Sequence, residues 1–326
     1  MKMRSHYFVP KFGLALATLV VLSCATTFAA EGSFQKTLQV SGSVNLDLTT
    51  GSGSVNVRTG AAGQVQVTGH IRVTSFFGSA DDRVRQIENN PPIQQSGNDI
   101  RIGHTGDMEL FHNISISYDL VVPPDTRLHS HTGSGSQKVE GLKGPVEAGS
   151  GSGSVDVSDI GDAVRADTGS GDIRIERVKG SVQAKAGSGS IRATDVAGGF
   201  EGRTGSGHIE LEQSAPGSVR AETGSGGLEL RGVNGSLDAS AGSGTISADG
   251  NPTGSWRVRT GSGSVHLKLA SAAGFDLDAH TSSGSISVNQ PVTVQGTLGR
   301  KEIRGKVHGG GVPIQVETGS GNIEIQ

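Results

Sequence analysis

The chain has 326 residues and a formal net charge of −3, and its 52 glycines make up about 16% of it, against about 7% in an average protein. Aromatic residues contribute 4% and the hydrophobic class 33%, which excludes a thick, aromatic-rich core. A single cysteine excludes an intrachain disulfide scaffold. The slight negative charge is not typical of a nucleic-acid-binding protein, and we expect no nucleic-acid partner.

Residues 1–29 have the three regions of a secretory signal peptide. Three basic residues within the first eleven precede an apolar run over 12–22, and small residues follow that run. The run is shorter than the roughly 20 residues that a membrane-spanning helix needs. We therefore expect export from the cytoplasm, with cleavage after Ala29.

A second interpretation of the same segment stays open. The stretch Val21-Leu22-Ser23-Cys24 resembles a bacterial lipobox. In that case residues 1–23 are removed, and Cys24 becomes the lipidated first residue of the mature protein. A lipid anchor on Cys24 would then be the chain's only attachment to a membrane.

Upstream of residue 132 the sequence predicts an irregular N-terminal β region, over 30–131, that is continuous with the repeats after it. A short helix is expected near 79–90, with Ser79 and Asp82 as a capping box and two prolines at its end. Strands are expected over 99–102 and 114–122, where apolar and polar residues alternate.

Gly-Ser-Gly motifs recur through the rest of the chain. From Gly133 to Gly261 they are spaced by 18 or 19 residues. Each unit holds two apolar-polar-apolar triplets, for example Ile173-Arg174-Ile175 and Val182-Gln183-Ala184. This alternation predicts short strands with one buried face. Two strands per unit with glycines at the corners predict an all-β, single-chain parallel β-solenoid of ~18-residue coils over 132–326. The sequence does not fix its handedness, and the crossover preference favours the right hand. The stretch 290–311 breaks the pattern, and we expect a loop or irregular coil there.

Stacked coils would place equivalent outward residues next to one another along the solenoid. The centres of the second triplets show no like charges in adjacent coils: Glu147, Arg165, Gln183, Glu201, Arg220, Asp238, Arg257 and Asp276. The first triplets are less regular, because Arg174 would meet Arg192 and Glu210 would meet Glu229. Opposite charges in such ladders stabilise and like charges destabilise, so the first series supports the stacking.

The corners carry two columns of hydroxyl side chains. A threonine column lies just before the corners: Thr132, Thr168, Thr204, Thr223, Thr260, Thr281 and Thr318. The serine column is the candidate surface-binding column: Ser152, Ser170, Ser188, Ser206, Ser225, Ser243 and Ser262. Hydroxyls at corners ordinarily bond to backbone groups. The alternative is a flat hydroxyl array that binds a repetitive surface such as a glycan or ice.

Other chemistry has weaker support in the sequence. Glycine at the corners is expected because it permits positive φ in tight turns. His129 and His131 would face the same side of a strand, but no third ligand lies at a persuasive spacing. Asp156, Asp159, Asp162 and Asp167 crowd one coil, and their expected role is that of solvated charges. We therefore expect no catalytic residues, no metal and no cofactor.

The repeated Thr-Gly-Ser-Gly-x-Ile-x-Ile coils, the Val-Pro-Pro before them, and the terminal Gly-Gly-Gly-Val-Pro-Ile and Thr-Gly-Ser-Gly-Asn-Ile-Glu-Ile resemble the DUF4097 family. These are bacterial β-strand-repeat proteins that carry the label "putative adhesin". The resemblance covers about residues 38–326. It implies an exported or envelope-associated β-solenoid, and it offers no established catalytic residues to carry over.

Together these features predict a non-catalytic exported β-solenoid that acts as an envelope scaffold or adhesin-like interaction surface. Its place would be the periplasm, the outer membrane surface or the extracellular space. Its partner would be an envelope or extracellular molecule, with polysaccharide among the candidates. The alternative is a glycan-binding module that uses the serine and threonine columns. A polysaccharide-active β-helix enzyme is the less favoured third interpretation.

Overall fold

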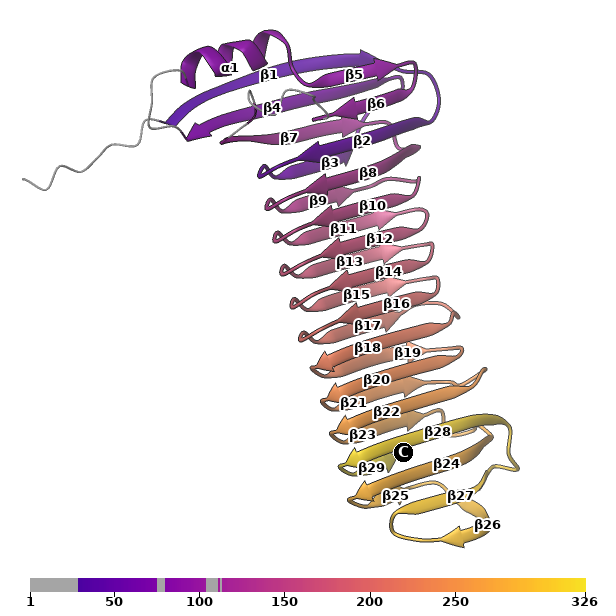
Figure 1. Ribbon diagram of the computed structural model, residues 1–326. Coiled ribbons are helices and arrows are strands. Elements are labelled where there is room, and N and C mark those ends of the chain that lie inside the picture. The colour runs from indigo at the N-terminus through magenta and orange to yellow at the C-terminus, as the bar shows by residue number, and fades with distance from the viewer. Residues whose placement is uncertain (1–28, 75–79, 104–110, 112) are drawn as a thin grey trace, which may run out of the picture.

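The computed structural model describes residues 29–74, 80–103, 111 and 113–326, and within them the chain forms a long rod (Figure 1). The expected signal peptide, Cys24 and the capping residue Ser79 lie outside the described residues. A 15-stranded and a 14-stranded sheet run the length of the rod. The expected β-solenoid is confirmed, because the chain alternates between the two sheets and equivalent strands of successive coils pair in parallel.

Each regular coil contributes one strand to each sheet. The strands in the 15-stranded sheet are β2 (Val44–Thr50), β8 (Thr126–Thr132), β10 (Val146–Ser150), β12 (Val164–Thr168), β14 (Val182–Ala186), β16 (Phe200–Thr204), β18 (Val219–Ser225), β20 (Leu237–Ser243) and β22 (Trp256–Ser262). Their counterparts in the 14-stranded sheet are β3 (Val55–Thr59), β9 (Gln137–Glu140), β11 (Val155–Ile160), β13 (Ile173–Val178), β15 (Ile191–Val196), β17 (Ile209–Gln213), β19 (Leu228–Val233), β21 (Ile246–Gly250) and β23 (Val265–Leu269). The Gly-Ser-Gly corners follow the strands of the first group and form one edge of the rod.

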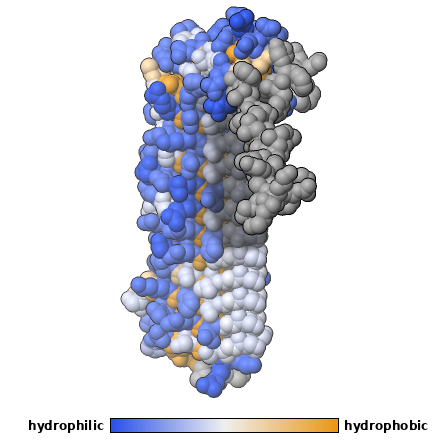
Figure 2. All heavy atoms as spheres, turned by 90° about the vertical axis from the view of Figure 1, so that its left-hand side faces the viewer, coloured by the Kyte–Doolittle hydropathy of each residue, from blue (hydrophilic) through white to orange (hydrophobic). Residues whose placement is uncertain are grey.

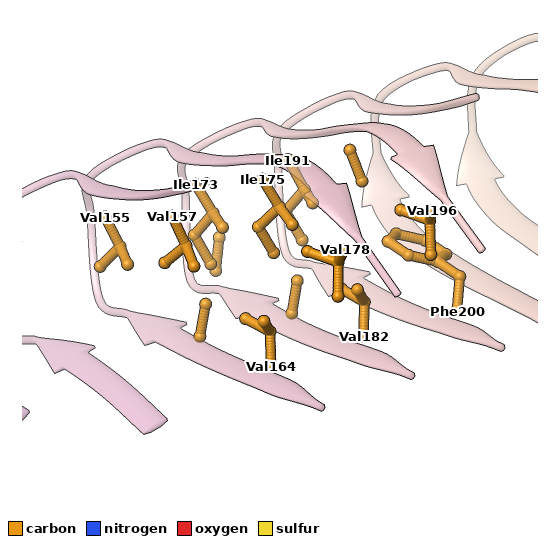
Figure 3. Close-up of a cluster of buried hydrophobic side chains, with 14 of the residues drawn as sticks. Val155, Val157, Val164, Ile173, Ile175, Val178, Val182, Ile191, Val196 and Phe200 are labelled. Carbon is orange, nitrogen blue, oxygen red and sulfur yellow. The ribbon is translucent and has the colours of Figure 1, made fainter. Parts of the chain in front are cut away.

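The core is a thin layer of aliphatic side chains between the two sheets. In β13, Ile173 and Ile175 point inward and are buried, while Arg174 between them is exposed. Val182 of β14 meets this layer from the opposite sheet (Figure 3). The alternation read from the sequence therefore corresponds to burial in the rod, since successive residues of a strand face opposite sides.

An antiparallel cap closes the N-terminal end of the rod. It consists of β1 (Ala29–Gln39), β4 (Gln64–Thr74), β5 (Ile93–Ser96), β6 (Asp99–Ile102), β7 (Ile114–Val122) and the helix α1 (Ala80–Asn89). The helix lies against the outermost strand β1 (Figure 1), where the Glu88 carboxylate accepts a 2.9 Å hydrogen bond from the backbone N–H of Ser33. Covering an edge strand in this way prevents it from pairing with another chain. The helix and both strands expected in this region are confirmed.

The coil formed by β2 and β3 belongs to the stack, although the chain leaves it for the cap. β2 pairs in parallel with β8, and β3 pairs in parallel with β9. The whole segment 60–125 is thus an excursion between two stacked neighbours. The stack itself reaches further toward the N-terminus than the regular repeats that begin at 132.

The C-terminal end has an order that the repeat spacing does not predict. Its strands are β24 (Phe275–Ser283), β25 (Ile286–Val288), β26 (Val292–Leu298), β27 (Glu302–Val307), β28 (Val312–Ser320) and β29 (Ile323–Ile325). The last coil inserts between two earlier ones, because β28 lies between β22 and β24, and β29 lies between β23 and β25. The C-terminus is therefore inside the stack and not at its end (Figure 1).

The expectation of a loop over 290–311 is wrong. β26 and β27 form an antiparallel hairpin that pairs with β24 and closes the end of the 15-stranded sheet. Ile303 and Val307 of β27 are buried. The alternation of apolar and polar residues persists in this stretch, but its glycines and basic residues obscure it in the sequence.

Candidate functional site

The serine column lies on the exposed edge formed by the Gly-Ser-Gly corners. All seven candidate serines are exposed, and Ser225, Ser243 and Ser262 pair in register with one another. Figure 2 faces this edge and shows, in its lower part, pale columns of near-neutral residues beside a strongly hydrophilic strand face. The structure thus brings the predicted serines into one continuous line.

The threonine column is not available for binding, which agrees with the ordinary role of corner hydroxyls and removes these threonines from the alternative binding surface. Its seven members are buried. The Thr168 hydroxyl donates a 2.9 Å hydrogen bond to the Gly153 carbonyl of the preceding coil and accepts one of 3.2 Å from the N–H of Gly171. Ser150 takes the same place in its coil. These hydroxyls thus connect each corner to the corner of the preceding coil by hydrogen bonds.

The expected positive φ occurs at the second glycine of several corners, between 146° and 158° in Gly244, Gly263, Gly284 and Gly321, but not at the first glycine. The φ of Gly187 does not lie in the left-handed region. A Cβ added to it would lie 2.3 Å from the carbonyl oxygen of Gly169, the equivalent residue of the preceding coil. Gly187 is therefore required by the close approach of successive corners and not by its backbone conformation.

A ladder of polar side chains runs along the outer face of the 15-stranded sheet, and we call it the charge ladder. Its members occupy one register position of successive strands: Arg101, Asp47, His129, Glu147, Arg165, Gln183, Glu201, Arg220, Asp238, Arg257, Gln315, Asp278 and Arg304. No two like charges are neighbours in it. From Glu147 to Arg257 the charge ladder agrees with the sequence prediction. On β24 its member is Asp278 and not the predicted Asp276. Gln315 lies between Arg257 and Asp278 because the last coil is inserted there.

Side-chain contacts tie the middle of the charge ladder together. Glu147 is contacted from both sides, by His129 Nδ1 at 3.3 Å and by Arg165 Nε at 3.5 Å. Arg165 donates a 2.9 Å hydrogen bond to Gln183, which in turn donates one of 3.2 Å to Glu201. These side chains hold one another in place along four successive strand pairs.

The other sheet carries the like-charge neighbours that the sequence predicts. Arg174 pairs in register with Arg192, and Glu210 pairs with Glu229. Contacts with opposite charges offset the repulsion within each pair. Arg174 contacts Asp156 at 3.5 Å, and Arg192 contacts Glu210 at 2.8 Å.

A groove runs along the charge ladder, where the strands of the 15-stranded sheet begin. Its volume is about 1000 Å³, and it extends from Arg127 on β8 to Gln315 on β28. The charge ladder forms one side of this groove. The residue before the first buried residue of each strand forms the other side and is small in most coils: Pro145, Ala163, Ser181, Gly199, Ser218, Ser236, Ser255 and Pro313. Buried residues such as Val182 form the floor.

Sequence reasoning missed this groove. A signal for it is present in the sequence. Each second triplet begins with a buried residue, and the two outward residues on either side of that residue differ in length. In the coil of β14 these are the small Ser181 and the long Gln183. A repeated small–long contrast leaves a trough once the coils are stacked.

The histidines and acidic residues that the structure describes are spread along the rod. His129 and His131 are both exposed on the same face of β8, as expected. Among the described residues no group of three or more His, Cys, Asp or Glu side chains is placed to hold a metal ion. The crowded aspartates serve separate contacts: Asp159 binds Arg177 at 2.6 Å, and Asp167 binds Arg165 at 3.0 Å.

Two carboxyl groups, the exposed Asp159 and the half-buried Glu324, have altered acidity. The hydrogen bond from the Arg177 guanidinium holds the pKa of Asp159 below its ordinary value. Hydrogen bonds from Gln326 and then His266 lower the pKa of Glu324. Both shifts favour the ionised form, the opposite of what a general acid requires at neutral pH.

Comparison with known proteins agrees with the repeat architecture. The family model described as Toastrack DUF4097 matches residues 178–326, so that the expected resemblance is confirmed over this part of the chain. No curated protein matches the chain.

Two solved structures are similar to it at low identity. A "putative cell adhesion protein" from Clostridium sporogenes is 13% identical, with 91% of this chain and 99% of that chain covered and a TM-score of 0.23. A "putative adhesin" from Bacteroides fragilis is 12% identical, with 90% and 97% covered and a TM-score of 0.36. Neither likeness is close enough to transfer a property to this chain.

Proposed function

We propose that this chain, whose residues 178–326 match the family model Toastrack DUF4097, is a non-catalytic exported rod that presents a repeated, adhesin-like interaction surface or serves as an envelope scaffold. The observation that carries the proposal is the charge ladder, in which one outward position repeats along the whole stack. A repeated row of side chains on a stiff support suits multivalent contact, because each further contact is made at a high effective concentration.

The construction of the rod supports a mechanical or binding role. Both sheets are continuous from the antiparallel cap to the terminal coils, and most of the backbone is tied into parallel ladders. Proteins of this kind are stable through contacts between neighbouring repeats and expose long binding surfaces. The surface positions are held in place before any partner arrives, which lowers the ordering cost of binding.

The charged side chains support a non-catalytic role. Exposed acids and bases largely form pairs with each other, such as Arg192 with Glu210 at 2.8 Å. The carboxyl groups of Asp159 and Glu324, whose pKa values are lowered, are both held ionised. We infer that the surface binds by charge and hydrogen bonding and performs no bond-breaking chemistry.

Export rests on the basic, apolar and small-residue regions of the first 29 residues. No helix in the described part of the chain is both long enough and apolar enough to cross a bilayer. We place the mature protein in the periplasm, on the outer membrane surface or outside the cell, with a membrane attachment only if Cys24 is lipidated.

A second candidate function is glycan binding along the serine column alone. The exposed, in-register hydroxyls on the flat corner edge favour it. It differs from the first candidate in the face used, since the serine column lies on the corner edge and the charge ladder on a strand face.

Binding of the purified protein to envelope fractions tests the proposal. We expect saturable binding to cell-wall or outer-membrane material and no turnover of a panel of polysaccharides. Turnover that a single point substitution abolishes would overturn the non-catalytic role. Absence of binding to every envelope fraction would overturn the interaction surface.

A further inference from the structure

The groove beside the charge ladder crosses the 15-stranded sheet from β8 to β28. We propose that it binds a linear polysaccharide carrying carboxylate groups, with the sugar chain running parallel to the rod axis. This inference rests on the proposed interaction function and adds to it the place and the chemical class of the ligand.

The charges of the groove favour an acidic ligand. Four arginines line it against three carboxylates. The carboxylates Glu147 and Glu201 are already engaged within the charge ladder. In contrast, neither Arg127 nor Arg257 forms an ion pair with any described residue, and Arg257 donates only to the neutral Gln315 at 3.2 Å. The third carboxylate, Asp238, pairs in register with Arg257 and contacts Arg259 at 3.9 Å. The two arginines without an ion pair thus lie toward the two ends of the groove.

These two arginines are far apart. β8 and β22 are separated by seven strand spacings of about 4.8 Å each, which places them about 34 Å apart. A small anion cannot reach both guanidinium groups. An extended polymer with acidic groups along its length can contact both and also the polar side chains between them. Guanidinium groups suit carboxylates because they donate in a planar fork.

The opposite side of the groove suits a hydroxyl-rich polymer. Ser181, Ser218, Ser236 and Ser255 line it, and Gly199 leaves a gap among them. Each serine hydroxyl both donates and accepts hydrogen bonds, as the hydroxyls of sugars do. A sugar chain in the groove would thus lie between a row of hydroxyls and a row of guanidinium, carboxamide and carboxylate groups.

The groove is poorly suited to a polypeptide. It crosses the strands in the interior of a sheet, where their backbone groups are already paired with neighbouring strands, so it offers no edge for strand addition. Its floor is closed: Phe200 and Trp256 are 2% and 1% exposed and provide no pocket for an apolar anchor. Since they also provide no stacking surface for sugar rings, binding must depend on charge and hydrogen bonds and should weaken in salt.

The direct test is titration of the purified protein with oligogalacturonate, a linear acidic sugar polymer, by calorimetry. A cello-oligosaccharide of equal length is the neutral comparison, and polyglutamate is the polypeptide comparison. We expect binding of oligogalacturonate that weakens with added salt and little binding of the other two. Equal binding of the neutral sugar would overturn the role of charge, and tighter binding of polyglutamate would show that the ligand is a polypeptide.

Matched variants locate the site. The double substitution R127Q and R257Q should weaken oligogalacturonate binding about tenfold, because it removes two exposed charge contacts. R58Q is the control, since Arg58 is an exposed arginine on β3 of the other sheet, also without an ion pair to a described residue. An equal loss in R58Q would contradict the groove and point to general attraction by positive charge.

A steric pair separates the groove from the corner edge. Ser181 and Ser188 belong to the same turn of chain around β14, and both are exposed. S181W should fill the groove and abolish binding, whereas S188W on the corner edge should have no effect. The reverse result would assign the ligand to the serine column. If no acidic sugar binds while the protein still binds envelope fractions, the groove inference fails and the proposed function stands; if neither binds, both fail.

Discussion

The hydroxyl of Thr168 donates a 2.9 Å hydrogen bond to the carbonyl of Gly153, which lies fifteen residues earlier in the corner of the preceding coil. The same bond recurs along the rod, for example from Thr204 to Gly189 at 2.8 Å. Each bond joins one coil to the next at the corner, where the strand ladders end. The corner motif therefore serves the stacking of coils as much as the turning of the chain.

Replacing Thr168 by valine keeps the shape of the side chain and removes the hydroxyl. We expect the free energy of unfolding to fall by about 1–2 kcal/mol, because the buried Gly153 carbonyl loses its partner. Ala186 and Ala241 occupy the equivalent place in other coils, so the stack tolerates the loss. Urea denaturation measures the effect. Ser170→Ala, on the exposed column, is the control and should change stability by less than about 0.5 kcal/mol.

Gly187→Ala tests the close approach of the corners. The new methyl group would lie 2.3 Å from the Gly169 oxygen, and we expect a loss of about 1–3 kcal/mol or more as the two coils are forced apart. Gly51→Ala is the matched control, since Gly51 begins the same motif in the first coil and has open space around it. Equal thermal stability of the two variants would refute the packing explanation.

The strands and their register could be predicted because each inward residue is apolar and each outward one polar, as in Val182-Gln183-Ala184. The insertion of β28 between β22 and β24 could not be predicted. Ile314 and Leu277 are both apolar, so the sequence does not show which of them lies beside Trp256. The groove could not be predicted from the sequence for a similar reason. Ser181 and Gln183 are unremarkable alone, and only stacking turns their difference in length into a trough.

Truncation after Gly311 tests the inserted coil. It removes β28 and β29, so that β24 loses its partner on the side of β22. We expect faster hydrogen exchange over 275–307, while the strands from β8 to β20 remain protected. Ile314→Asp, which buries a charge in β28, should have the same regional effect. Unchanged protection over 275–307 in both variants would contradict the observed strand order.

The pair formed by Asp159 and Arg177 predicts a small dependence of stability on pH. Since Arg177 lowers the pKa of Asp159 in the folded state, the pair stabilises the protein above the ordinary pKa of an aspartate, near 3.9. This contribution is lost as the pH falls through the lower pKa of the folded state. The effect is small because both side chains are exposed.

The substitution Arg177→Gln should remove this contribution at neutral pH and make little difference at pH 2. Thermal melts of the two proteins at several pH values measure it, with Arg85→Gln on the helix α1 as a control far from the pair. If the difference between wild type and Arg177→Gln were as large at pH 2 as at pH 7, the ion pair would not be its source.

The central claim is an exported rod that meets its partner outside the cytoplasm. The most direct measurement fractionates cells that produce the full chain, determines the N-terminal residue of the mature protein, and treats intact cells with protease. We predict a processed protein outside the cytosol that begins at Ala30 or at a lipidated Cys24. An unprocessed protein in the cytosol that begins at Met1 would contradict the account.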